Sequence, residues 1–304
     1  MPLLASLNKF ARMLPPARSK AVLGRLITDR LIPSSHSTVT EVPMRAGHKM
    51  LLDPRSRTEG GPFWNGEFDE DDIAFFRASI QAGDTVFDVG ANVGLISIPI
   101  GCHLAALGSG KLISFEPIAA NYERLTANLK LNGLEKLSRA YNVALGDHEG
   151  TLEISLETRN GAQTGNAIAS EIVGNTEGFT RISCALTRLD TLAEQEGFDK
   201  VDFIKVDIEG AEMLFLNGAA GFVTAHRPTV YGEFNAGLMP QFGHSFLDVF
   251  KFFKARGYRT FAFADALVPF ELTDPGPATG NAFFVAEEKA DSLLQRVAQA
   301  RAKR

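Results

Sequence analysis

The chain has 304 residues, 45% of them hydrophobic and 22% charged, which suffices for one large domain or one and a half, with a sizeable core. Its formal charge of −5 argues against a protein that binds nucleic acid through a basic surface. The two cysteines, Cys102 and Cys184, form no metal-ligand or disulfide pattern, and no run of about 18 apolar residues or apolar signal segment is present. We therefore expect a cytoplasmic protein without a membrane-spanning helix.

The first 45 residues are predicted to form two short amphipathic helices. Apolar residues alternate there with Lys and Arg, and Pro15 and Pro16 divide the pattern into two. The favoured interpretation is a helical cap packed on the rest of the chain. The alternative is peripheral contact of residues 1–31 with an anionic membrane surface or with a partner.

The next segment, residues 46–80, leads into the main domain. Alternating residues over 37–53 predict a β-hairpin, and residues 60–68 are rich in turn-forming residues, so we expect a loop there. That loop carries the single tryptophan, Trp64, as a core anchor or as a wall of a pocket. Acidic residues at 69–72 suit the positive end of a helix that runs to about residue 81.

A strand, a glycine turn, a helix and a second strand are predicted between Asp84 and Glu116. Residues 85–89 are β-branched or aromatic around one acid, and a helix over about 93–107 leads to a strand over 111–115. Two parallel strands require such a crossover, so the segment predicts a βαβ unit within a doubly wound α/β sheet. Open sheets of this kind bind ligands at the carboxyl ends of their strands.

The turn itself indicates the kind of ligand. A dinucleotide-binding turn has glycine at three positions, G-x-G-x-x-G, whereas Gly90 is followed here by Asn92 and Leu95. An acid at the end of the second strand, Glu116, is suited to accept hydrogen bonds from ribose hydroxyls. The pattern therefore favours an adenosine without a pyrophosphate, as in S-adenosylmethionine. The alternative is that Gly90 and Gly94 serve helix packing and that Glu116 is a solvated strand end.

The middle of the chain continues the alternation of helices and strands. We expect a helix over 121–131 and a third strand over 139–145, whose residues Asn142, Val143 and Ala144 would reach the adenine. Strands over 151–157 and 181–185 flank a polar segment, 158–178, interpreted as a long mobile loop. Loops of this length are typically functional lids or disordered segments.

A second group of acidic residues follows two further strands, 201–207 and 229–235. The strand ends place Asp207, Glu209, Glu212 and Glu233 on one rim of the sheet, beside the reactive part of a ligand. Lys205 lies inside an apolar strand and must be paired with one of these acids. The alternative for Glu209 and Glu212 is that they only stabilise a helix N-terminus.

The C-terminal part predicts a helix over 246–256, strands over 259–263 and 281–285, and a Pro-rich loop over 269–277. These strands would form an antiparallel hairpin beside the parallel sheet. The chain is thus divided into a helical segment (1–45), a hairpin and entry helix (46–80), a main domain (81–288) and a charged helix (289–304).

The chain resembles the FkbM family of S-adenosylmethionine-dependent methyltransferases over roughly residues 80–285. The resemblance implies a class I, Rossmann-like methyltransferase fold and, for many members, O-methylation of a hydroxyl in a sugar or glycan, a lipopolysaccharide or a natural product. It is carried by Val86-Phe-Asp88-Val-Gly90-Ala-Asn92-Val-Gly94, Phe115-Glu116-Pro117, Val143-Ala-Leu-Gly-Asp147, Leu189-Asp190-Thr-Leu, Phe203-Ile-Lys205-Val-Asp207-Ile-Glu209-Gly210-Ala-Glu212, and Arg227-Pro228 before Glu233.

Roles for the site follow from the motifs and from the chemistry of methyl transfer. The turn Asp88–Gly94, Glu116 and residues 142–144 would bind S-adenosylmethionine, with Asp207 beside the donor and the acceptor. A hydroxyl acceptor needs a base or a metal. The candidate catalytic residues are Asp207, Glu209 and His244, and the candidate acceptor-binding residues are Glu212, Glu233 and Asn235.

Three alternatives remain open at this point. The acidic rim suits Mg²⁺ by ligand type, although no spacing demands a metal. A nicotinamide-dependent oxidoreductase would use a similar sheet, but Asn92 and Leu95 disfavour it. A catalytically silent relative would bind the cofactor or a glycan without reaction.

Overall fold

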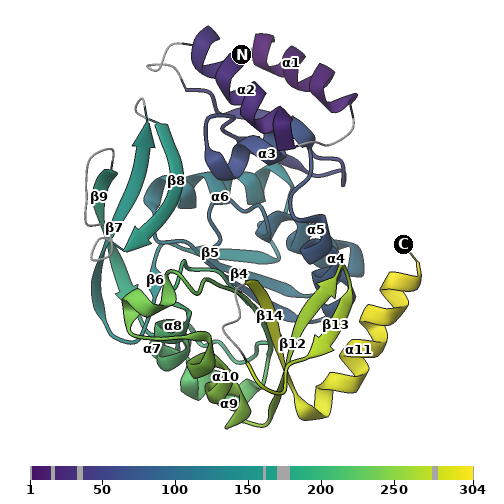
Figure 1. The fold of residues 1–304 in the computed structure, drawn as a ribbon, viewed down its shortest axis with the longest axis vertical. Helices are drawn as coiled ribbons and strands as arrows, with labels where there is room; N and C mark the ends of the chain where they lie inside the picture. The colour runs from purple at the N-terminus through teal and green to yellow at the C-terminus, as the bar shows by residue number, and fades with distance from the viewer. Residues whose placement is uncertain are drawn as a thin grey trace.

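The computed structural model describes residues 2–14, 18–32, 37–159, 162–169, 179–275 and 280–303. An eight-stranded sheet with the order β13-β12-β14-β11-β10-β3-β4-β5 forms its centre (Figure 1). Five neighbouring strands run parallel, and β14, β12 and β13 complete the sheet through antiparallel pairs. The strands are β3 (Thr85–Val89), β4 (Lys111–Phe115), β5 (Ser138–Tyr141), β10 (Phe203–Val206), β11 (Thr229–Phe234), β12 (Tyr258–Asp265), β13 (Val268–Glu271) and β14 (Gly280–Ala286).

Helices cover both faces of this sheet, and each face has its own apolar layer. The central strands β3 and β10 are buried along their whole length, which explains their nearly continuous apolar sequence. One layer involves α4 (Glu70–Ser79), α5 (Ser97–Leu107), α6 (Ala119–Leu131) and α11 (Glu287–Ala302), and the other involves α7 (Leu189–Glu196), α8 (Glu212–Gly218), α9 (Ala220–His226) and α10 (Phe246–Lys254). This is the predicted class I methyltransferase arrangement with a C-terminal antiparallel part, and the fold prediction is confirmed.

A second, four-stranded sheet corrects two predictions. Its order is β6-β9-β7-β8, from β6 (Ala144–Leu145), β7 (Gly150–Arg159), β8 (Ala162–Ala169) and β9 (Phe179–Thr187). The predicted loop 158–178 is wrong for residues 162–169, which pair with β7; residues 170–178 lie outside the described part. The neighbouring strand supplies hydrogen bonds that a polar sequence does not reveal, although Asn160-Gly161 is a dipeptide typical of hairpins.

The predicted third strand, 139–145, is divided between the two sheets. Residues 138–141 form β5, whereas Ala144 and Leu145 form β6 and pair with β9. The side-chain amide of Asn142 donates to the backbone carbonyls of Glu116 and Pro117, both at 2.9 Å, and so fixes the crossing point. The predicted Pro-rich loop is also wrong at its start, because residues 268–271 form β13.

The N-terminal part consists of α1 (Pro2–Arg12), α2 (Arg18–Leu31), the hairpin β1 (Thr40–Pro43) with β2 (Lys49–Leu52), and α3 (Arg57–Asn65). The two helices and the hairpin agree with the sequence, but the predicted loop over 60–68 is largely helical. Ser56 begins α3 by accepting the N–H of Glu59 at 3.3 Å, and this cap outweighs the glycines and proline that follow it. Trp64 is buried against Gly24 of α2, so it is a core anchor and does not line the cavity described below.

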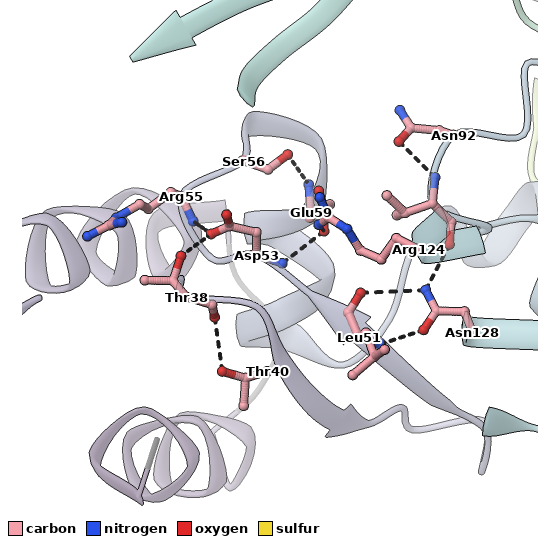
Figure 2. Close-up of polar contacts among 11 residues, drawn as sticks. Thr38, Thr40, Leu51, Asp53, Arg55, Ser56, Glu59, Asn92, Arg124 and Asn128 are labelled. Atoms are coloured by element: carbon pink, nitrogen blue, oxygen red, sulfur yellow. Dashed lines mark hydrogen bonds and ion pairs between the residues drawn. The ribbon is translucent and has the colours of Figure 1, made fainter. Parts of the chain in front are cut away.

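Polar side chains bind this N-terminal part to the main sheet (Figure 2). Buried Glu59 accepts from Arg124 of α6 at 2.6 Å and from the N–H of Asp53 at 2.8 Å. Asn128 of α6 accepts from the N–H of Leu51 at 2.7 Å and donates to the carbonyl of Val93 at 2.8 Å. One helix thus connects the hairpin to the turn that follows β3. No helix in the described ranges is both long and apolar enough to cross a membrane.

Candidate active site

A cavity of about 640 Å³ opens at the carboxyl ends of β3, β4, β10 and β11. This volume is within the range of small-molecule sites. Its walls come from the turn after β3, the segment after β4, the second sheet, the ends of β10 and β11, and the N-terminus of α4. Residues that follow β3, β4, β10 and β11 therefore meet at one place, as predicted.

Gly90 allows the turn after β3 to approach β10. Its φ is +79°, and an added Cβ would lie 2.1 Å from the backbone oxygen of Asp207, so a side chain there would separate the two strand ends. Gly94 has another role: its Cβ would meet Leu125 at 2.9 Å, and it does not line the cavity. The packing interpretation therefore holds for Gly94, whereas Gly90 lines the cavity.

Glu116 is the central polar group of the β3–β4 end. It is 4% exposed, and it accepts from the N–H of Asn92 at 2.8 Å, the N–H of Ile118 at 3.0 Å and the side-chain amide of Asn121 at 3.3 Å. Burial raises the pKa of Glu116 to about 7, although these donors oppose the shift. The alternative of a solvated strand end is wrong.

Other predicted donor-binding residues are placed differently. Asn92 lines the cavity with φ at +50°, and its side-chain oxygen accepts the N–H of Val93. Val143 and Ala144 line the cavity, but Asn142 does not. Asp88 is fully buried beneath the turn, where it accepts from Ser97 at 2.6 Å.

Lys205 connects the buried acid with the rim. Its Nζ lies 3.2 Å from Oδ1 of Asp88 and 3.6 Å from Oδ2 of Asp207, and it donates to the carbonyl of Gly90 at 3.1 Å. Burial alone would lower the pKa of Lys205, but the two carboxylates outweigh it and raise the pKa. The predicted pairing of Lys205 with a neighbouring acid is confirmed.

The acidic rim contains some predicted residues and lacks others. Asp207, Glu209, Glu233 and Asn235 line the cavity. Burial, followed by the charges of Asp207 and Asp69, raises the pKa of Glu233. Among the described residues, no group of three or more His, Cys, Asp or Glu is arranged to hold a metal ion.

Glu212 and His244 do not line this cavity. Glu212 is buried, and its Oε1 accepts from the N–H groups of Ile208 at 3.3 Å and Gly210 at 3.1 Å, so it stabilises the turn before α8. Burial raises its pKa to about 7. The backbone N–H of His244 donates to the carbonyl of Met239, in the turn that precedes α10.

Sequence reasoning missed the contribution of α4 and of two strand residues. Asp69 and Asp72 line the cavity, together with Tyr231 of β11 and Asn281 of β14, whose amide donates to Asp72 at 3.0 Å. The pKa of Asp69 is raised to about 6 by partial burial and by the charges of Asp72 and Asp207. The available signal was the run of four acids at 69–72, which the helix dipole explains without a functional role.

Tyr231 introduces a buried hydroxyl into this acidic end. The residue is 3% exposed, and its hydroxyl makes no hydrogen bond of normal geometry. Burial, followed by the nearby charge of Asp72, raises the pKa of Tyr231. The β10–β11 end therefore presents carboxylates, a neutral hydroxyl and an amide.

The sequence model for the methyltransferase FkbM domain matches residues 88–260, which include the turn after β3 and the ends of β4, β10 and β11. The chain belongs to the FkbM methyltransferase family. This membership favours methyl transfer over the nicotinamide-dependent oxidoreductase that the sheet alone left open.

The individual methyltransferases that this chain resembles share little sequence identity with it. Methyltransferase sdnD of Sordaria araneosa is 28% identical over an alignment of 173 residues. The match covers 48% of this chain and 64% of that protein, which is less than two thirds of the relative. A methyltransferase FkbM structure from Methylobacillus flagellatus KT has 15% identity and a TM-score of 0.44, over 67% of this chain and 44% of the other. A SAM-dependent O-methyltransferase structure from Thermotoga maritima has 10% identity and a TM-score of 0.38, over 81% and 77%.

Proposed function

We propose that this FkbM methyltransferase transfers a methyl group from S-adenosylmethionine to a hydroxyl of a sugar or of another polyhydroxylated acceptor. The observation that carries the proposal is the division of one cavity into two chemically different ends. A buried carboxylate with organised backbone donors lies at the β3–β4 end, and a group of carboxylates with a buried hydroxyl lies at the β10–β11 end.

The β3–β4 end fits the nucleoside part of S-adenosylmethionine. Three protein donors leave part of the acceptor capacity of the Glu116 carboxylate unused, and this capacity suits ribose hydroxyls. Val143 and Ala144 offer an apolar surface to a purine. The turn that includes Asn92 offers no row of backbone N–H groups to a pyrophosphate, because the N–H of Asn92 already donates to Glu116.

The β10–β11 end fits an acceptor that is neutral or cationic. Burial raises the pKa of Asp69, Asp72 and Glu233, and the charge of Asp207 adds to each shift. Lys205 is the single Lys or Arg among the described lining residues. The carboxylates would repel an anionic acceptor, and this repulsion is strong in a partly desolvated cavity. Carboxylates, the Tyr231 hydroxyl and the Asn281 amide are suited to hydrogen bonds with several hydroxyls.

Methyl transfer also requires alignment and removal of the hydroxyl proton. The bound donor supplies an electrophilic methyl group, and the protein aligns an acceptor oxygen with it and takes its proton. Asp207 and Glu209 remain candidates for the proton acceptor because both line the cavity. Asp69 joins them, since its pKa of about 6 suits a base near neutral pH. His244 is no longer a candidate.

Calorimetry and a labelled-methyl assay test the proposal in sequence. We expect S-adenosylmethionine and S-adenosylhomocysteine to bind and NAD to show no binding. Binding of NAD without binding of either of the other two compounds would contradict the donor assignment. With labelled donor, neutral or amino saccharides should be methylated and matched uronic acids should not. Donor binding without transfer to any hydroxyl compound, including cell-envelope glycans, would favour the catalytically silent alternative.

A further inference from the structure

The N-terminal helices expose an unusual share of the large apolar residues. Of the eleven exposed large hydrophobic residues among the described ones, seven lie between residues 10 and 31. Single exposed apolar residues are ordinary, but a concentration of this kind marks an interaction surface. We call this set the N-terminal patch: Phe10, Met13, Leu14, Val22, Leu23, Leu26 and Leu31.

The patch includes the outer faces of α1 and α2, whose inner faces are already occupied. On α2, Val22 and Leu26 are 54% and 62% exposed, whereas Gly24 and Thr28, on the opposite side, are buried. On α1, Leu4 is buried and Phe10 is 66% exposed. Packing on α3 therefore leaves a second apolar face uncovered.

The patch is held firmly on the main domain. Asn8 and Arg12 of α1 donate to the carbonyl of Phe63 in α3, and Lys20 of α2 donates to carbonyls at the end of α1. Glu59 and Arg124 then join α3 to α6 (Figure 2). The helices α1 and α2 lie at one end of the molecule, away from α9 and α10 (Figure 1).

The segment that carries the patch also differs from the rest of the chain in its net charge. Residues 1–31 contain six Lys or Arg and one acid, so their formal charge is +5, whereas the whole chain carries −5 and the remainder therefore −10. Lys9 and Arg30 are exposed beside the apolar residues. An apolar face bordered by cations suits the interface of a bilayer with anionic headgroups.

We infer that the N-terminal patch docks on a membrane surface rich in anionic lipids. The helices lie in the interfacial plane, with the apolar side chains among the headgroups and the basic side chains on lipid phosphates. A second copy of the chain is the competing occupant. Twofold pairing through this patch would bring two segments of charge +5 together, and their repulsion disfavours it. This inference does not depend on the acceptor proposed above.

Co-sedimentation of the full chain with lipid vesicles tests the inference. We expect binding to phosphatidylcholine vesicles that contain phosphatidylglycerol, weak binding to phosphatidylcholine alone, and release at high salt. Leu26→Glu should weaken the partition by at least about tenfold, because one apolar side chain is lost from the interface. Leu247→Glu on α10 is the matched control, since Leu247 is also an exposed leucine on a helix, and it should bind as the unaltered chain does.

Three results would overturn the inference. They are equal binding to both vesicle types, equal binding of Leu26→Glu and Leu247→Glu, and a dimer in solution that Leu26→Glu dissociates. Both side chains are exposed, so both variants should retain the unfolding midpoint of the parent chain, and this measurement shows that any loss of binding comes from the patch.

Discussion

The two ends of the cavity differ in how their carboxylates are stabilised. At the β3–β4 end the carboxylate of Glu116 is buried, and three protein N–H groups donate to it. At the β10–β11 end burial and the charges of neighbouring carboxylates raise the pKa of Asp69 and Glu233, and one ammonium group, that of Lys205, offsets part of this negative charge. The first end is organised before any ligand arrives, whereas the second becomes favourable when a hydrogen-bond donor or a cation enters it.

Removal of Lys205 should have the largest effect on this comparison. Lys205→Met leaves the fully buried carboxylate of Asp88 without its ion pair, and we expect a loss of about 3–5 kcal/mol in the free energy of unfolding. Denaturant unfolding at neutral pH measures it. Lys200→Met is the matched control: Lys200 pairs with Asp202 at the surface, and its loss should cost less than about 1 kcal/mol. Equal losses would show that Lys205 does not hold the two ends together.

The contact between the two ends is tested at Gly90. Gly90→Ala and Gly83→Ala both place a side chain at positive φ, +79° and +84°, which costs about 1–2 kcal/mol. An alanine at Gly90 also meets the backbone oxygen of Asp207, whereas nothing lies within 4 Å at Gly83, so Gly90→Ala should cost about 1–3 kcal/mol more. Thermal or denaturant unfolding of the two variants gives the difference. If they are equally stable, the strand ends can separate without cost.

The organised end is tested by donor binding to a Glu116→Gln variant. The new amide cannot accept at both positions, so affinity for S-adenosylhomocysteine should fall by about 1.5–3 kcal/mol in calorimetry. Glu135→Gln, a change at an exposed glutamate, is the control and should bind normally. Unchanged affinity in Glu116→Gln would remove this carboxylate from the donor site.

The same carboxylate predicts a smaller effect of pH. Burial raises the pKa of Glu116 to about 7, so in the free protein it takes up a proton as the pH falls through 7. The protonated group is a poorer acceptor, so the affinity for the donor should fall from pH 8 to pH 6. Uptake of one proton changes this affinity by at most about tenfold per pH unit. Fold stability changes in the opposite direction: a carboxyl pKa above its unfolded value adds stability below about pH 4.5, and this is lost as the pH rises through 7. In Glu116→Gln both dependences should flatten.

Much of the site was predictable because it follows strand ends. Gly90, Asn92, Glu116, Asp207, Glu209 and Glu233 each come directly after or at the end of a predicted parallel strand, and parallel strands bring these ends to one edge. Lys205 was predictable as paired, since an isolated buried ammonium is too costly. Asp69 and Asp72 were missed because they precede the sheet, and their helix could be placed over the cavity only by packing.

Some residues that were predicted in the site lie outside the cavity, and the structure gives a specific reason for Asn142 and Glu212. Asn142 was expected in the site, but its amide is used by the carbonyls of Glu116 and Pro117 where the chain leaves one sheet for the other. Glu212 follows the strand end but turns inward to hold backbone N–H groups. His244 was a candidate on residue type alone, and nothing in the sequence specified its position.

The sequence by itself determined the parallel strands of the main sheet, the glycine turn and the acids at the strand ends, because hydrophobic periodicity and backbone preferences are local properties. Tertiary structure decided which of those side chains share a cavity, how their charges shift one another's pKa, and that an apolar face of the N-terminal helices stays uncovered. These properties depend on distances between segments far apart in the chain, and such distances are set when the layers pack around the sheet.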